Sequence, residues 1–176
     1  YEGNETLTDF PVYLEIDPGI ESFSYEQFAS PAGFDIRFVG SDGAEELKYE
    51  PGEWNPTGVS SFWVRVPELK ADTTITVKWG NPDALTQPDY CLNGSIWNRY
   101  HAVWHMEGND PTVIRESRGS LHGTATNFVE NPRVPGVIGK ALSFDGVNDY
   151  VNLPIEAHPP ADVKQLTISF WTYGGA

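Results

Sequence analysis

Short stretches of alternating apolar and polar residues run through the first half of the chain. In residues 9–17, Phe10, Val12, Leu14 and Ile16 fall on one side of an extended backbone, and polar residues or Tyr fall on the other. Period-two alternation is typical of a half-buried strand. Further stretches with strand composition are residues 34–39, 45–50, 61–66 and 73–79. The pattern predicts a small antiparallel sandwich of about five strands.

Residues 139–154 contain two more strand patterns around a polar turn. Leu142 and Phe144 alternate with smaller or polar residues before the turn, and a similar alternation resumes after it. Asp145-Gly146 begins the turn, because Gly takes the positive φ that tight turns require. This stretch predicts a β-hairpin.

Composition supports an all-β protein. The 176 residues include 14 Pro and 17 Gly, so turn signals recur every few residues, and no long apolar segment of helical period is present. Such spacing of short strands and turns favours sandwiches over helical folds.

The net charge and the cysteine content argue against several classes of protein. A formal net charge of −14 argues against nucleic-acid binding and against docking on anionic membranes. No apolar run reaches the length of a membrane span. Cys91 is the only cysteine, so neither an intrachain disulfide nor a cysteine-rich zinc site is expected.

Residues 1–88 resemble a bacterial domain of unknown function found in large envelope-associated proteins, some of which also carry a MotA/TolQ/ExbB-type proton-channel segment. The segments that carry the resemblance are residues 7–12, 35–38, 47–50, 54–55, 62–67 and 79–82. The resemblance implies a small β-sandwich domain in a protein of the bacterial envelope.

Residues 100–176 resemble the N-terminal half of a laminin-G-like, concanavalin A-like jelly roll. The matching segments are residues 101–107, 116–123, 141–151 and 166–171. The resemblance implies that residues 166–171 form a core strand, and that neighbouring domains or chains complete the second sandwich. Residues 89–99 are expected to be a linker. The predicted fold is therefore all-β, with two tandem antiparallel sandwiches, the second a partial jelly roll.

Calcium is the cofactor that the laminin-G-like resemblance implies. Hard cations take several carboxylate, amide and carbonyl oxygens, and the candidate ligands are Glu107, Asp110, Glu116, Asp145 and Asp149. In the alternative interpretation, Asp145 and Asp149 only form the turn.

Four aromatic residues in or near predicted loops are candidates for stacking on sugar rings: Tyr49, Trp54, Trp97 and Tyr173. In the alternative interpretation, they anchor loops to the core. No nucleophile motif, phosphate-binding loop or paired-carboxylate pattern is evident, so we expect a protein that is not an enzyme.

The leading functional hypothesis is extracellular recognition or adhesion within a larger bacterial surface or secreted protein, with a glycan as the ligand. A structural spacer or assembly unit of a surface stalk or filament is the first alternative. An accessory domain of a polysaccharide-degrading enzyme is the second.

Overall fold

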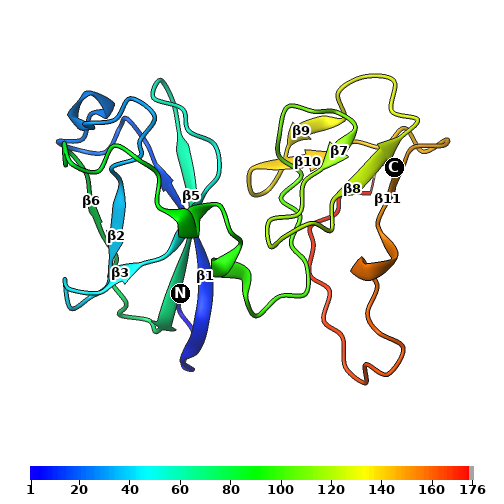
Figure 1. The fold of residues 1–176 in the computed structure, drawn as a ribbon, viewed down its shortest axis with the longest axis horizontal. Helices are drawn as coiled ribbons and strands as arrows, with labels where there is room; N and C mark the ends of the chain where they lie inside the picture. Colours follow the sequence, from blue (N-terminus) through cyan, green and yellow to red (C-terminus); the bar gives the residue numbers. More distant parts are fainter. Residues whose placement is uncertain (175–176) are drawn as a thin grey trace. The chain divides into compact units, whose positions relative to one another are not determined.

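The computed structural model describes residues 1–174. The chain forms two compact units, Tyr1–Tyr100 and His101–Ala176 (Figure 1). All sheets are antiparallel, and the helices of the described chain are 3-10 turns of three residues. The expected all-β class is confirmed. Among residues 1–174, no helix combines the length and hydrophobicity needed to cross a bilayer.

The first unit has two sheets of three strands, one in the order β1-β5-β4 and the other in the order β3-β2-β6 (Figure 1). The strands are β1 (Leu7–Ile16), β2 (Arg37–Val39), β3 (Glu46–Leu47), β4 (Tyr49–Pro51), β5 (Ser60–Leu69) and β6 (Thr76–Lys78). Each lies within or overlaps a stretch that the alternation pattern indicates.

Phe38 of β2 joins the two sheets into a sandwich. Its ring is fully buried, and its centroid lies 5.1 Å from that of Tyr49 on β4 and 5.3 Å from that of Phe62 on β5. Leu47, Ile16 and Val64 belong to the same core. Because side chains alternate between the faces of a strand, the intervening residues point away from this core.

Loops of the first unit are anchored by a second group of aromatic rings. Phe23, Phe28 and Trp54 pack against Tyr25 of the 3-10 helix η1 (Tyr25–Gln27). Trp79 joins the group through Phe23 and Phe28. The Tyr25 hydroxyl lies 2.9 Å from the carbonyl of β1 residue 16 and 2.8 Å from Ser60 Oγ of β5. These contacts fix the loops against the β1-β5-β4 sheet.

Asp35 ties three loop segments together through one buried carboxylate. Its oxygens accept hydrogen bonds from the backbone amides of Ala29 (3.0 Å), Ser30 (2.9 Å) and Gly80 (2.7 Å). Burial opposes ionisation, but these three amides outweigh it and hold the pKa of Asp35 below its ordinary value.

Residues 89–99 differ from the expected linker. They contain the 3-10 helices η2 (Asp89–Cys91) and η3 (Ser95–Trp97), and Cys91, Ile96 and Trp97 are buried. The compact first unit extends through Tyr100. Burial of these apolar side chains is the physical reason that the segment folds with the first unit.

The second unit contains two small sheets and the 3-10 helix η4 (Ile155–Ala157). One sheet has the order β11-β8-β7 and the other pairs β10 with β9. Their bounds are β7 (Val113–Ile114), β8 (Gly123–Thr126), β9 (Arg133–Pro135), β10 (Lys140–Leu142) and β11 (Tyr150–Asn152).

The hairpin expected over residues 139–154 is wrong in its pairing. Its first strand, β10, pairs with β9, and its second, β11, pairs with β8 in the other sheet. The turn itself is present, with Gly146 at φ 73°. Local alternation detects strands, but the choice of partner depends on contacts more distant in sequence.

The core strand expected over residues 166–171 is also wrong. No strand is assigned after β11 in the described chain, and Figure 1 draws this part without an arrow. Leu166, Ile168 and Phe170 are 57%, 71% and 74% exposed. The segment has the alternation of a strand but no partner strand among residues 1–174.

Asp35→Asn should destabilise the protein by about 2–3 kcal/mol, because a charge-assisted acceptor of buried amides is replaced in part by a donor. Because the folded-state pKa of Asp35 is lowered, its contribution is present above the unfolded pKa and is lost as pH falls through the folded one. The difference in free energy of unfolding between the wild type and Asp35→Asn should therefore decrease as the pH is lowered. Urea unfolding of both proteins at neutral and acidic pH measures it.

Asp42→Asn is the matched control. Asp42 also accepts two backbone amides, those of Ala44 and Glu45, but lies in an exposed turn. Asp42→Asn should destabilise the protein much less than Asp35→Asn, because water can replace the carboxylate as the acceptor in an exposed turn. Equal losses in the two variants would contradict the role given to the buried carboxylate.

Candidate functional site

Four aromatic rings form a continuous row associated with the β1-β5-β4 sheet of the first unit. Tyr13 lies opposite Trp63 in the register of β1 and β5, with ring centroids 5.1 Å apart. Trp97 of η3 follows at 5.3 Å from Trp63, and Tyr100 at 5.5 Å from Trp97. Tyr13 and Trp63 alternate with the core residues of their strands, so they lie on the outer face. We call these four residues the aromatic row.

The aromatic row combines buried support with accessible ring surface. Trp97 is only 3% exposed and holds the centre, whereas Tyr100 is 38% exposed. Tyr13 and Trp63 are half-buried. A ring that is fixed on one side and open on the other loses little side-chain entropy when a ligand stacks on it.

Carboxylates flank the row at hydrogen-bonding distance. The Tyr13 hydroxyl donates to Glu15 Oε1 (3.1 Å), and Trp97 Nε1 donates to Glu50 Oε2 (2.8 Å). Glu50 lies opposite Trp63 in the register of β4 and β5. These groups fix the orientation of the rings and add hydrogen-bond acceptors beside them.

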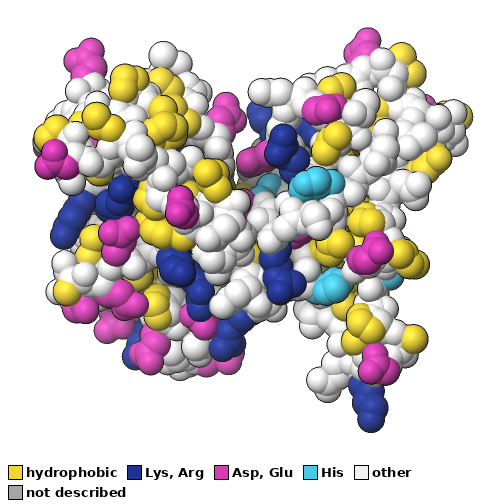
Figure 2. All heavy atoms as spheres, viewed as in Figure 1, with side chains coloured by type: hydrophobic (Ala, Val, Ile, Leu, Met, Phe, Trp, Pro, Cys, Tyr) yellow, Lys and Arg dark blue, Asp and Glu magenta, His cyan; other side chains and the backbone are white. Residues whose placement is uncertain are grey.

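An ion-pair network connects β1 to β5 and to Arg99, the residue before Tyr100 of the row. Arg65 contacts Asp9 through its Nη2 atom at 2.6 Å, and Arg99 Nε lies 3.2 Å from the other oxygen of Asp9. The hydrogen bond from Arg65 is the main reason that the pKa of Asp9 is lowered. Figure 2 shows further acidic side chains spread over the visible face of the first unit.

The predicted sugar-stacking residues occupy different environments. Tyr49 is 1% exposed within the core, so it offers no ring face to a ligand. The prediction that Tyr49 stacks on a sugar ring is therefore wrong. Trp54 donates from Nε1 to the Pro31 carbonyl (2.9 Å) and packs against loop aromatics, as an anchor would. Trp97 is a buried support of the aromatic row, and Tyr173 is 96% exposed.

Sequence reasoning missed Tyr13, Trp63 and Tyr100. Tyr13 and Trp63 stand at the positions of β1 and β5 where alternation predicts solvent-facing residues. Large aromatic rings at such positions are the signal that could have found them. Their assembly with Trp97 depends on the fold of residues 89–99, which was expected to be a linker.

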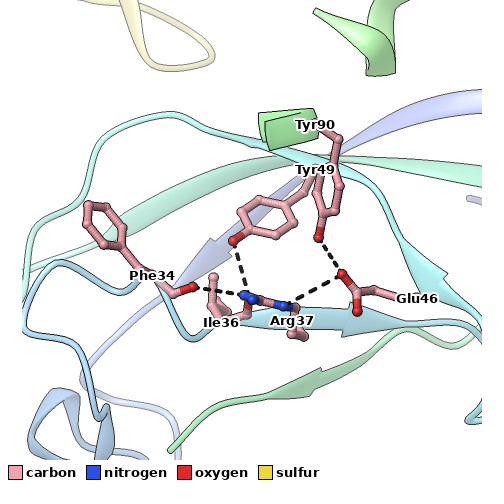
Figure 3. Close-up of polar contacts among 6 residues, drawn as sticks. All are labelled: Phe34, Ile36, Arg37, Glu46, Tyr49 and Tyr90. Carbon is pink, nitrogen blue, oxygen red and sulfur yellow. Dashed lines mark hydrogen bonds and ion pairs between the residues drawn. The ribbon is translucent and has the colours of Figure 1, made fainter. Parts of the chain in front are cut away.

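A second polar cluster lies beside the core, between β2, β3, β4 and η2 (Figure 3). Arg37 Nη1 donates to the carbonyls of Phe34 (2.8 Å) and Ile36 (2.6 Å), and Arg37 Nε lies 3.6 Å from Glu46 Oε1. The Tyr90 hydroxyl donates to the same Glu46 oxygen at 2.6 Å. The cluster connects η2 to the strands.

Burial keeps the hydroxyl and thiol groups around this cluster protonated at neutral pH. It raises the pKa of Tyr49 and of Tyr90, and it raises the pKa of the neighbouring Cys91 thiol to about 11. A thiol with a raised pKa is a poor nucleophile at neutral pH. We therefore assign this cluster a structural role.

The five candidate calcium ligands are not gathered into one site. Glu116 is 4% exposed, and its carboxylate accepts the backbone amides of Val103 (3.1 Å), Arg118 (2.8 Å) and Gly119 (2.7 Å). Asp110 accepts from Thr112 within its own turn. The Glu107 carboxylate lies beside Gly139 instead.

Asp145 and Asp149 do lie together across their turn. The Asp145 amide donates to Asp149 Oδ2 (2.9 Å), and Asp145 Oδ1 accepts the amides of Val147 and Asn148. Those amides, that of Val147 first, lower the pKa of Asp145. Asp149 Oδ1 is buried without a hydrogen-bond partner in the described structure.

Two carboxylates are fewer ligands than calcium requires, since it takes roughly six to eight oxygens. Within residues 1–174, no group of three or more His, Cys, Asp or Glu residues is placed to hold a metal ion. The donor set therefore does not fit a complete calcium site. The expectation of calcium stays a prediction, and its remaining basis is the pair formed by Asp145 and Asp149.

Comparison with known families identifies one segment. Residues 32–91 match the family described as a domain of unknown function (DUF2341). The match spans β2 to η2 and includes the polar cluster, whereas β1 and the core residues Ile16 and Phe28 lie outside it. It supports the resemblance of the first part to a domain of unknown function. No curated protein and no solved structure gives a significant match.

Cys91 should react slowly with a thiol reagent in the folded protein. With a pKa of about 11, roughly one thiol in a thousand is ionised at pH 8, and the side chain is 3% exposed. We expect labelling by 5,5′-dithiobis(2-nitrobenzoate) to be at least about 100-fold faster in guanidinium than in buffer. Rapid stoichiometric labelling of the native protein would show an accessible, activated thiol.

Proposed function

We propose that the chain is a non-catalytic recognition module of a larger bacterial surface or secreted protein, and that its ligand is a carbohydrate. The aromatic row carries this proposal. Tyr13, Trp63 and Tyr100 keep part of their surface accessible around the buried Trp97, and Glu15 and Glu50 place carboxylate acceptors next to these rings. Aromatic faces pack on the apolar faces of sugar rings, while carboxylates accept their hydroxyl groups.

The arrangement suits an extended ligand better than a small enclosed substrate. The accessible rings of Tyr13 and Trp63 lie 5.1 Å apart across β1 and β5, and Tyr100 follows beyond the buried Trp97. Successive rings of this kind can contact neighbouring sugar units of one chain. We therefore expect an oligosaccharide or polysaccharide to bind more tightly than a monosaccharide.

Binding should not depend on calcium. The acidic groups of the row are engaged with Tyr13 and Trp97, and the candidate calcium pair, Asp145 and Asp149, belongs to the other compact unit. Recognition by aromatic packing and hydrogen bonds needs no metal. Equal glycan binding in calcium and in EDTA is the expected result.

Tyr13→Ala should weaken glycan binding about tenfold, which corresponds to about 1.4 kcal/mol. The substitution removes an end of the row on the outer face and leaves the core residues in place. A glycan array identifies the ligand, and titration calorimetry on that ligand measures the change in Kd.

Tyr150→Ala is the matched control, because Tyr150 is a 48% exposed tyrosine on β11 of the second unit. The Kd of the Tyr150→Ala variant for the glycan should equal that of the wild type. A Tyr13→Ala protein that is folded and binds as well as the wild type would refute the assignment. The same conclusion follows if the folded wild type binds no glycan on the array.

A further inference from the structure

An open apolar groove runs along one edge of the first unit, between β1 and β6. Its volume is about 330 Å³. Val12, Leu14 and Ile16 line it from β1, and Ile75 and Val77 line it from the β6 side. The groove is separate from the aromatic row, because these β1 residues alternate with Tyr13.

The groove lies where each sheet ends. In the described chain, β1 pairs only with β5 and β6 pairs only with β2, so both are edge strands. Pro11 has no amide hydrogen to donate, which leaves Val12–Ile16 as the part of β1 best suited to accept another strand. An edge strand beside an apolar groove is the acceptor geometry of β-strand addition.

The same chain carries a segment with the properties of the missing strand. Residues 163–173 read Val-Lys-Gln-Leu-Thr-Ile-Ser-Phe-Trp-Thr-Tyr. Leu166, Ile168 and Phe170 share one side of an extended backbone, and they are 57%, 71% and 74% exposed. β-Branched and aromatic residues at this spacing favour strands, yet the segment has no partner strand in the described chain.

Charge complementarity favours contact between these two surfaces. Glu15 and Asp17 are acidic residues at this edge of β1, beside the groove, and the Glu15 carboxylate is directed to Tyr13 on the outer face. Residues 163–173 contain one Lys and no Asp or Glu, within a chain whose net charge is −14. The donor segment therefore brings no negative charge next to Glu15 and Asp17 at the rim of the apolar groove of another copy.

We propose that residues 163–173 of a second copy add to the free edge of β1, with Leu166, Ile168 and Phe170 seated in the groove. Donor and acceptor are different surfaces, so the contact is heterologous. Reciprocal exchange closes a dimer, and one-way exchange builds a chain of copies. The interaction is independent of glycan binding at the aromatic row.

Complementation between two variants tests the proposal. Ile168→Asp disables the donor and keeps the groove, while Leu14→Arg fills the groove and keeps the donor. Each variant alone should sediment as a 19.5 kDa monomer. An equimolar mixture should give a complex of twice that mass, because one copy supplies an intact donor and the other an intact acceptor.

Ser169→Asp is the matched control, because Ser169 points away from the groove in the proposed register. It should self-associate like the wild type. If Leu14→Arg unfolds, as judged by circular dichroism, Ile75→Arg replaces it. A synthetic peptide of residues 163–173 should also convert wild-type oligomers into peptide-bound monomers.

Three results would overturn the proposal. The wild type could remain monomeric throughout a concentration series in analytical ultracentrifugation. Ile168→Asp could associate as strongly as the wild type. The mixture of folded variants could remain monomeric. Each outcome leaves the glycan measurement on the aromatic row unaffected, so the two proposals fail or hold separately.

Discussion

Contact between Phe38 and the rings of Tyr49 and Phe62 is the interaction on which the first unit depends. It closes two sheets of short strands around one core. Once that core fixes which side chains of β1 and β5 point inward, strict alternation sends Tyr13 and Trp63 outward. The aromatic row is therefore a consequence of the same register that packs the core. A one-residue slip of β1 would remove both at once.

The second unit is held together in a different way. Among residues 101–174, Ile114 is the buried hydrophobic residue, and polar centres organise the loops around it. Glu116 accepts three backbone amides, and Arg133 donates to the carbonyls of Met106, Asp110, Glu107 and Val113. These hydrogen bonds fix turns, while much apolar surface, such as Val129 at 93%, stays exposed.

Much of the fold was predictable because local alternation carries strand information. The positions of β1, β5 and β6 follow from it. Strand pairing was harder to predict from the sequence. β10 and β11 look like the two strands of one hairpin, but β10 pairs with β9 and β11 pairs with β8 in a different sheet. Residues 166–171 alternate as a strand does, and yet the structure forms none there. Partner choice is set by distant packing, which a single stretch of sequence does not contain.

The candidate site was harder to predict for the same reason. Tyr49 and Trp97 could be singled out as aromatic residues, but their burial depends on η2 and η3 folding back onto the first unit. Residues 89–99 look like a linker because they include Asn93, Gly94 and Asn98, which favour turns, and show no strand alternation. Glu116 resembles a metal ligand by type, and only the structure shows that backbone amides occupy both its oxygens.

The most direct test of recognition at the aromatic row is an NMR titration with the glycan selected by the array. The indole signals of the six tryptophans can be assigned by substitution and followed together. The row predicts that Trp63 and its neighbour Trp97 shift with saturation, while Trp54 and Trp79 of the loop cluster do not. Shifts confined to the loop cluster or to the second unit would contradict the central claim that this sheet face binds the ligand.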